Sequence, residues 1–158
     1  FSMIYLASDH RGFEAKEKIK LWLAEWGYDF RDCGPSAYNG ADDYVEYVAI
    51  AAEKVSEDPS QNLGIVLGAT GQGEAMVANR RRGVRAAVYY GGPLEIVRLS
   101  RLHNASNVLS LGVAPGNTTE EMIVMEEDAI KSAVKTWLET QFSNDERHVR
   151  RIAMIDPL

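Results

Sequence analysis

Residues 64–79 read Gly-Ile-Val-Leu-Gly-Ala-Thr-Gly-Gln-Gly-Glu-Ala-Met-Val-Ala-Asn, and this stretch decides the fold. Its first part, with Leu63 before it, is a short and nearly all-apolar run that predicts a buried strand of a parallel sheet. Its second part has helical spacing. The glycines between the two parts allow a sharp backbone turn with bare N–H groups where the helix begins. The stretch therefore predicts a strand, an anion-holding turn and a helix in succession.

Two polar side chains accompany this turn. Thr70 has a hydroxyl that can donate or accept a hydrogen bond, and Glu74 places a carboxylate at the start of the helix. Anion-stabilising donors beside a candidate general base suit the removal of a proton from a carbon next to a carbonyl. Plainer explanations exist, because a first-turn glutamate also complements the helix dipole and glycine-rich turns also occur for packing alone. No third glycine follows Gly71-Gln72-Gly73 and no Gly-Lys-Ser/Thr is present, which disfavours a nucleotide loop.

The rest of the chain predicts four more strands and several helices. Strands are expected at 3–7, around Tyr28 and Phe30, at 84–90 and at 108–111. Helices are expected at 15–26, at 44–55 with Asp42 or Asp43 as cap, at 93–103, from the capping box Thr118-Thr119-Glu120-Glu121 through Met122, Met125, Ala129, Ala133 and Trp137, and within 143–158.

This alternation predicts an α/β, three-layer, Rossmann-like fold. A five-stranded parallel sheet would carry helices on both faces, with right-handed crossovers and a further C-terminal helix. Ligands of such sheets bind beyond the carboxyl ends of the strands. We therefore expect a site where the first, third and fourth strands end, and near His103.

Composition narrows the function. The 158 residues suit one domain, and a net charge of −6 argues against a general nucleic-acid binder. No apolar run approaches the roughly 18 residues of a membrane span and the N-terminus has no signal-peptide pattern, so a cytoplasmic protein is expected. One cysteine, Cys33, and three scattered histidines predict neither a disulfide nor a metal site. Phe1 and Ser2, before Met3, are interpreted as residues left from expression.

Four motifs cover almost the whole chain and resemble the ribose-5-phosphate isomerase B and galactose-6-phosphate isomerase family. In order, they are Ser8-Asp9-His10-Arg11-Gly12-Phe13-Glu14, Gly68-Ala69-Thr70-Gly71-Gln72-Gly73-Glu74 with Ala78-Asn79, Leu99-Ser100-Arg101-Leu102-His103-Asn104 with Asn107-Val108-Leu109, and Arg147-His148-Val149-Arg150-Arg151. Each motif alone is weak, but their order matches that of the family.

The resemblance implies an isomerase that interconverts an aldose phosphate and a ketose phosphate through a cis-enediolate, most simply ribose 5-phosphate and ribulose 5-phosphate. It implies a homodimer, with a tetramer as the larger alternative, whose active sites combine both subunits. Neither a metal nor an organic cofactor is implied. Many members have a cysteine where this chain has Gly68, whereas another branch uses a glutamate where it has Glu74. This chain resembles the second branch.

The roles that the resemblance implies fall into two groups. The catalytic residues would be Glu74 as the proton shuttle, Thr70 at the enediolate oxygen, and Asp9 and His103 for opening the sugar ring. The substrate-binding residues would be Gly71, Gln72 and Gly73 through their N–H groups, Asn104 at a hydroxyl or the enediolate, and His10, Arg147 and Arg151 at the phosphate. Asp9 could equally cap a helix, His103 could complement a helix end, and the arginines could form a solvated face.

Three departures from the family pattern leave the substrate open. Gly112-Val113-Ala114 replaces a common Gly-x-Arg and so removes an expected phosphate ligand, Asn79-Arg80 replaces the usual Asn-Lys, and Val45 stands where proline is frequent. Arg80, Arg81 or Arg82 could replace the lost charge or could equally form only a solvated helix end. Tetrose, pentose and hexose phosphates each remain candidates. The competing functions are a non-catalytic sugar-phosphate binder or a subunit of a hetero-oligomeric isomerase and, on the turn alone, a flavodoxin-like or nucleotide-binding module.

Overall fold

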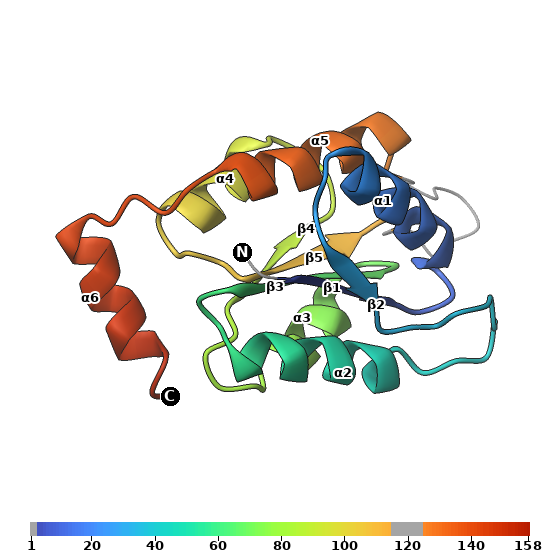
Figure 1. Cartoon of the computed structure of the whole chain (residues 1–158), viewed down its shortest axis with the longest axis horizontal. Coiled ribbons are helices and arrows are strands. Elements are labelled where there is room, and N and C mark those ends of the chain that lie inside the picture. The colour runs from blue at the N-terminus through green and yellow to red at the C-terminus, as the bar shows by residue number, and fades with distance from the viewer. Residues whose placement is uncertain (1–2, 115–124) are drawn as a thin grey trace.

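A single five-stranded parallel sheet, in the order β2-β1-β3-β5-β4, forms the centre of the computed structural model, which describes residues 3–114 and 125–158 (Figure 1). Its strands are β1 (Met3–Ser8), β2 (Phe30–Asp32), β3 (Asn62–Gly68), β4 (Ala86–Tyr89) and β5 (Val108–Gly112). The helices of these ranges are α1 (Phe13–Glu25), α2 (Tyr44–Glu57), α3 (Gln72–Ala78), α4 (Glu95–Leu102), α5 (Glu127–Glu139) and α6 (Glu146–Ile155). The predicted α/β architecture is confirmed.

Helices cover both faces of the sheet. Helices α1, α4 and α5 pack on one face around Ile19, Val97 and Trp137, and α2 and α3 pack on the other around Val48 and Ala78 (Figure 1). Every residue of β3 is buried, as its continuous apolar sequence predicts for a central strand. Helix α6 lies apart from these layers, near the end of the sheet where the strands begin (Figure 1).

The chain path reverses direction between two neighbouring strands, β1 and β3. It leaves β1 through α1 for the edge strand β2 and returns through α2, on the opposite face, to β3 on the other side of β1. Such a reversal separates the loops that follow the two neighbouring strands and opens a crevice at their carboxyl ends. The loop after β1 still begins against β3, because the N–H of Asp9 donates to the carbonyl of Leu67 at 3.3 Å.

The start of one helix differs from the prediction, and the predicted cap of another lacks a side-chain hydrogen bond. Met125 precedes α5 rather than lying in it, and its N–H donates to the carbonyl of Val113 at 2.9 Å, so the expected helix through Met125 is wrong. The capping box and Met122 lie outside the described residues. Asp43 is the N-terminal cap of α2, but its side chain makes no capping hydrogen bond. Among the described helices, none is long and apolar enough to cross a membrane.

Candidate active site

The turn after β3 is held against the end of β5. The hydroxyl of Ser110 donates to the carbonyl of Gly71 at 2.6 Å, and the N–H of Val113 donates to the carbonyl of Gly68 at 3.0 Å. Gly71 has a φ of 75°, and a Cβ added to it would lie 3.0 Å from the backbone nitrogen of Gly112. Glycine is therefore required here both by the backbone conformation and by the close approach of β5. Two hydrogen bonds and close packing thus hold the turn against β5.

Glu74 lies in the first turn of α3 and is only 4% exposed. Its carboxylate lies over the α-carbon of Gly68, so that a Cβ added at position 68 would overlap Oε1 of Glu74. The space that a side chain at position 68 would fill is thus occupied by the carboxylate. This explains in physical terms why a glycine at 68 accompanies a glutamate at 74.

The surroundings of Glu74 favour its protonated form. Burial, and secondarily the negative charge of Asp9, raise the pKa of Glu74 above its ordinary value of 4.5, while a hydrogen bond from its own backbone N–H opposes the rise. No cation of the described chain lowers it. A carboxylate with a raised pKa is a better proton acceptor, which suits a general base that works near neutral pH.

The turn retains two free backbone donors. The exposed hydroxyl of Thr70 accepts the N–H of Gln72 at 3.3 Å, so one of the three expected N–H groups is already engaged. The N–H groups of Gly71 and Gly73 donate to no acceptor within the described ranges. Free donors beside a buried carboxylate are what a developing oxyanion requires.

Asp9 and His10 reach the same region from the end of β1. Asp9 accepts the N–H of Gly12 at 3.0 Å, so it caps the approach to α1 as well as lying near enough to Glu74 to influence its charge. Nδ1 of His10 lies 2.9 Å from Oδ1 of Asp42, a contact that the sequence did not indicate. The only sequence signal at Asp42 was its position before a helix.

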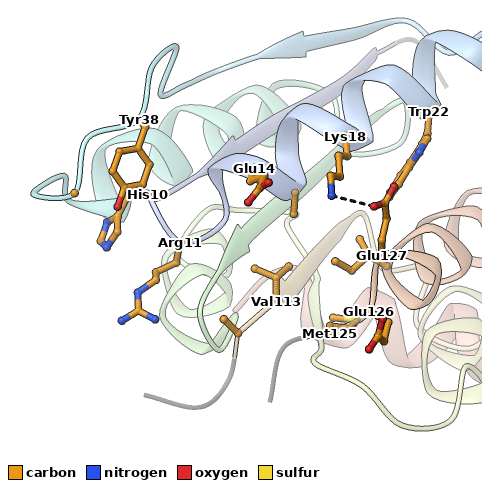
Figure 2. Close-up of a pocket in the computed structure, with 14 residues that line it drawn as sticks. His10, Arg11, Glu14, Lys18, Trp22, Tyr38, Val113, Met125, Glu126 and Glu127 are labelled. Carbon is orange, nitrogen blue, oxygen red and sulfur yellow. Dashed lines mark hydrogen bonds and ion pairs between the residues drawn. The ribbon is translucent and has the colours of Figure 1, made fainter. Parts of the chain in front are cut away.

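A cleft of about 660 Å³ adjoins this cluster between α1 and α5 (Figure 2). His10 and Arg11 lie at one end of it, and Lys18 and Glu127 pair at the other with an Nζ–Oε2 distance of 2.9 Å. Its apolar lining includes Trp22, Val113, Ala114, Met125 and Ile130. Glu74 does not line this cleft, so the cleft extends the region beside His10 rather than containing the carboxylate.

The remaining predicted site residues lie at the other end of the sheet. His103 is the C-terminal cap of α4, which runs back to the side where the strands begin, and Asn104 follows it. The ring of His103 lies 4.3 Å from that of His148 on α6. Arg147 and Arg151, on the same helix, are exposed. One chain therefore brings together Asp9, His10 and residues 70–74 but separates them from His103, Asn104 and the arginines.

His148 is the buried member of the histidine pair. It is 5% exposed, and its Nδ1 lies 2.9 Å from the hydroxyl of Ser143. Burial and the neighbouring charges of His103 and Arg147 lower the pKa of His148. A neutral ring beside His103 avoids a clash of two positive charges.

The three consecutive arginines also lie at the end of the sheet where the strands begin. Arg80, Arg81 and Arg82 line a second cleft of about 660 Å³ together with Asn104 and Ile155. Arg81 pairs with Glu53 at 2.8 Å, which leaves Arg80 and Arg82 as the candidates to replace the arginine missing at position 114. That replacement stays a prediction.

Within residues 3–114 and 125–158, no group of three or more histidine, cysteine, aspartate or glutamate side chains could hold a metal ion.

A family model, similar sequences and similar solved structures all relate this chain to sugar-phosphate isomerases. The family model described as Ribose/Galactose Isomerase matches residues 4–155. Ribose-5-phosphate isomerase B of Mycolicibacterium paratuberculosis is 34% identical over 96% of this chain and 88% of its own. The crystal structure of ribose-5-phosphate isomerase B from Mycoplasma genitalium with bound ribulose 5-phosphate has a TM-score of 0.86 at 30% identity, covering 98% of this chain and 94% of that one. The enzyme from Thermotoga maritima has a TM-score of 0.82 at 34% identity, covering 99% of both chains. The chain belongs to the Ribose/Galactose Isomerase family.

Proposed function

We propose that this protein is an aldose-ketose isomerase that interconverts ribose 5-phosphate and ribulose 5-phosphate. The observation that carries the proposal is the buried carboxylate of Glu74, with a raised pKa, over Gly68 in a turn whose Gly71 and Gly73 N–H groups are free. Relatives that cover nearly the whole chain are ribose-5-phosphate isomerases B, and one structural neighbour holds ribulose 5-phosphate.

The reaction divides into ring opening and proton transfer. Asp9 and His103 move the proton that opens the sugar ring, and a histidine suits this task because its two ring nitrogens can donate and accept a proton. Glu74 then takes the proton from C2 of the open-chain aldose, the electron pair forms the C1–C2 double bond, and the carbonyl at C1 becomes an enediolate oxygen. The N–H groups of Gly71 and Gly73, with Thr70, stabilise this oxygen. A proton moves from O2 to O1 of this intermediate, and protonated Glu74 then returns its own proton to C1, which leaves a hydroxyl at C1 and the ketone at C2.

The substrate phosphate and the second subunit complete the proposed site. His10 from one chain and Arg147 and Arg151 from its partner bind the phosphate, since guanidinium groups match its geometry. The separation of His103 and α6 from Glu74 within one chain supports a homodimer whose sites combine both subunits. Exposed apolar side chains on α6, Val149 and Met154 among them, suit a helix that packs on a second copy.

We place the enzyme in the cytoplasm, within the pentose phosphate pathway. Cys33, the single cysteine of the chain, is unpaired, as is usual in a reducing compartment.

Proton exchange tests the reaction. In deuterated water, the enzyme should incorporate deuterium at C2 of ribose 5-phosphate while ribulose 5-phosphate accumulates, both followed by NMR. A panel of tetrose, pentose and hexose phosphates in the same assay identifies the preferred chain length. A thermal shift with ribose 5-phosphate but no exchange would instead support the non-catalytic binder that the loss of arginine at Ala114 suggests.

Mixed dimers test the shared site. Glu74→Gln and His103→Asn should each be nearly inactive, but unfolding and refolding them together in equal amounts should restore about a quarter of the wild-type activity, because half of the dimers then carry one intact site of two. Refolding each variant alone is the control. Failure of the mixture to exceed the two controls would show that both residues act within one chain.

A further inference from the structure

Asp42 lies in the loop between β2 and α2 and has an unusual environment for a loop aspartate. Its side chain is 1% exposed. Oδ1 accepts the backbone N–H of His10 at 3.1 Å and lies 2.9 Å from Nδ1 of the same residue. Oδ2 is buried and has no hydrogen-bond partner in the described part of the chain. Within the described residues, both hydrogen-bond contacts of the Asp42 carboxylate are therefore with His10.

This contact assigns a hydrogen to one nitrogen of the ring. An ionised carboxylate only accepts hydrogen bonds, so Nδ1 of His10 must donate. Nε2, which has no partner among residues 3–114 and 125–158, is then the nitrogen left for a ligand. A buried carboxylate is costly without a positive partner, and His10 is the residue that forms an ion pair with Asp42 when its ring is protonated.

The same loop also limits rotation of the ring. Tyr38 packs edge-on against His10, with ring centroids 6.1 Å apart at 87° (Figure 2). Tyr38 also packs edge-on against Phe13, with ring centroids 6.4 Å apart. The His10 side chain remains 26% exposed and lines the cleft beside Arg11. The loop between β2 and α2 thus contacts the His10 ring through Asp42 and Tyr38, and a third side of the ring stays open to a ligand.

We propose that Asp42 is a positioning residue that holds His10 with its hydrogen on Nδ1, so that the ring presents Nε2 to the substrate phosphate. An ionised phosphate oxygen accepts hydrogen bonds, so Nε2 of His10 must carry a hydrogen when phosphate binds, while the hydrogen on Nδ1 stays directed at Asp42. This inference rests on the proposed function for the role of His10 but adds a residue that no motif of the family supplied.

Nitrogen NMR of the histidine rings tests the arrangement without any assay of activity. The chain has three histidines, so His103→Gln and His148→Gln leave the His10 signals identifiable. In the free protein, His10 should carry hydrogen on Nδ1, and saturating inorganic phosphate should yield a ring with hydrogen on both nitrogens. A free protein with hydrogen on Nε2 alone, or His10 signals that phosphate does not alter, would overturn the proposal.

Kinetics of Asp42→Asn test the consequence. This variant keeps the shape and one oxygen but loses the charge, and KM for ribose 5-phosphate should rise about tenfold with kcat within about twofold, as for a lost charge-assisted contact. Asp43→Asn is the matched control and should match wild type, because the Asp43 side chain makes no capping bond. A KM for Asp42→Asn equal to that of the control, or a fall in kcat alone, would refute a positioning role. Should the wild type fail to isomerise any sugar phosphate, the proposed function falls while the NMR result still decides the role of Asp42.

Discussion

Lys16 on α1 and Glu74 on α3 are both buried ionisable side chains, yet the fold treats them in opposite ways. Lys16 is 0% exposed and donates to Asp32 at 2.6 Å and to the carbonyl of Pro35 at 2.8 Å. Glu74 is 4% exposed and has a raised pKa, and within residues 3–114 and 125–158 Asp9 is the one charged side chain that influences it. A buried ionisable side chain with oppositely charged partners has a structural role, whereas one without such a partner is available for catalysis.

Neutralising Glu74 should have the largest effect. Glu74→Gln should lower kcat by roughly 10²- to 10⁴-fold, the usual contribution of a positioned base, while the free energy of unfolding stays the same or rises because a poorly compensated carboxylate is removed. Turnover and urea unfolding measure the two effects. Glu46→Gln is the matched control, since Glu46 also lies in the first turn of a helix but is exposed. Equal losses in both variants would reduce Glu74 to a complement of the helix dipole.

Removing the charge of Lys16 should have the next largest effect. Lys16→Met should lower the free energy of unfolding by about 3 kcal/mol, because Asp32 and the carbonyl of Pro35 lose their buried donor, and should leave kcat within about twofold. Chemical denaturation gives the first quantity and turnover of the folded variant gives the second. Lys18→Met, which breaks the exposed ion pair with Glu127, should cost less than about 1 kcal/mol. A catalytic defect in Lys16→Met with unchanged stability would contradict the purely structural role of Lys16.

The smallest expected effect concerns pH. Glu74 must be ionised to accept a proton, so the raised pKa should place the acid limb of kcat/KM above 4.5. The folded state prefers the protonated carboxyl, so its contribution to stability is present at low pH and is lost as the pH rises through the raised pKa. Relative to Glu74→Gln, the wild type should therefore gain stability as the pH falls from 7 toward 5. Parallel pH dependences of the two proteins would place the titration elsewhere.

Much of the fold was predictable because it depends on local patterns. The apolar run ending in Gly68, the helical spacing of Ile19 and Trp22, and the turn glycines each specify an element through burial or backbone freedom, and alternation of those elements leaves few topologies. Where a local pattern competed with a distant contact, the prediction failed. Met125 has helical spacing relative to Ala129, but its N–H pairs with Val113 and it lies before the helix.

Local sequence patterns were enough to predict which residue types lie together after β1 and β3, since the strand-turn order places Asp9, His10 and residues 70–74 at one end of the sheet. The three-dimensional packing was needed to show that Asp42 contacts His10, that Thr70 accepts the N–H of Gln72, and that His103 lies at the opposite end from Glu74. The difference arises from the sequence distance over which each interaction acts. Periodicity and turn chemistry act over a few residues, whereas hydrogen bonds between loops 32 residues apart, and the partnering of a buried charge, depend on how the whole chain packs.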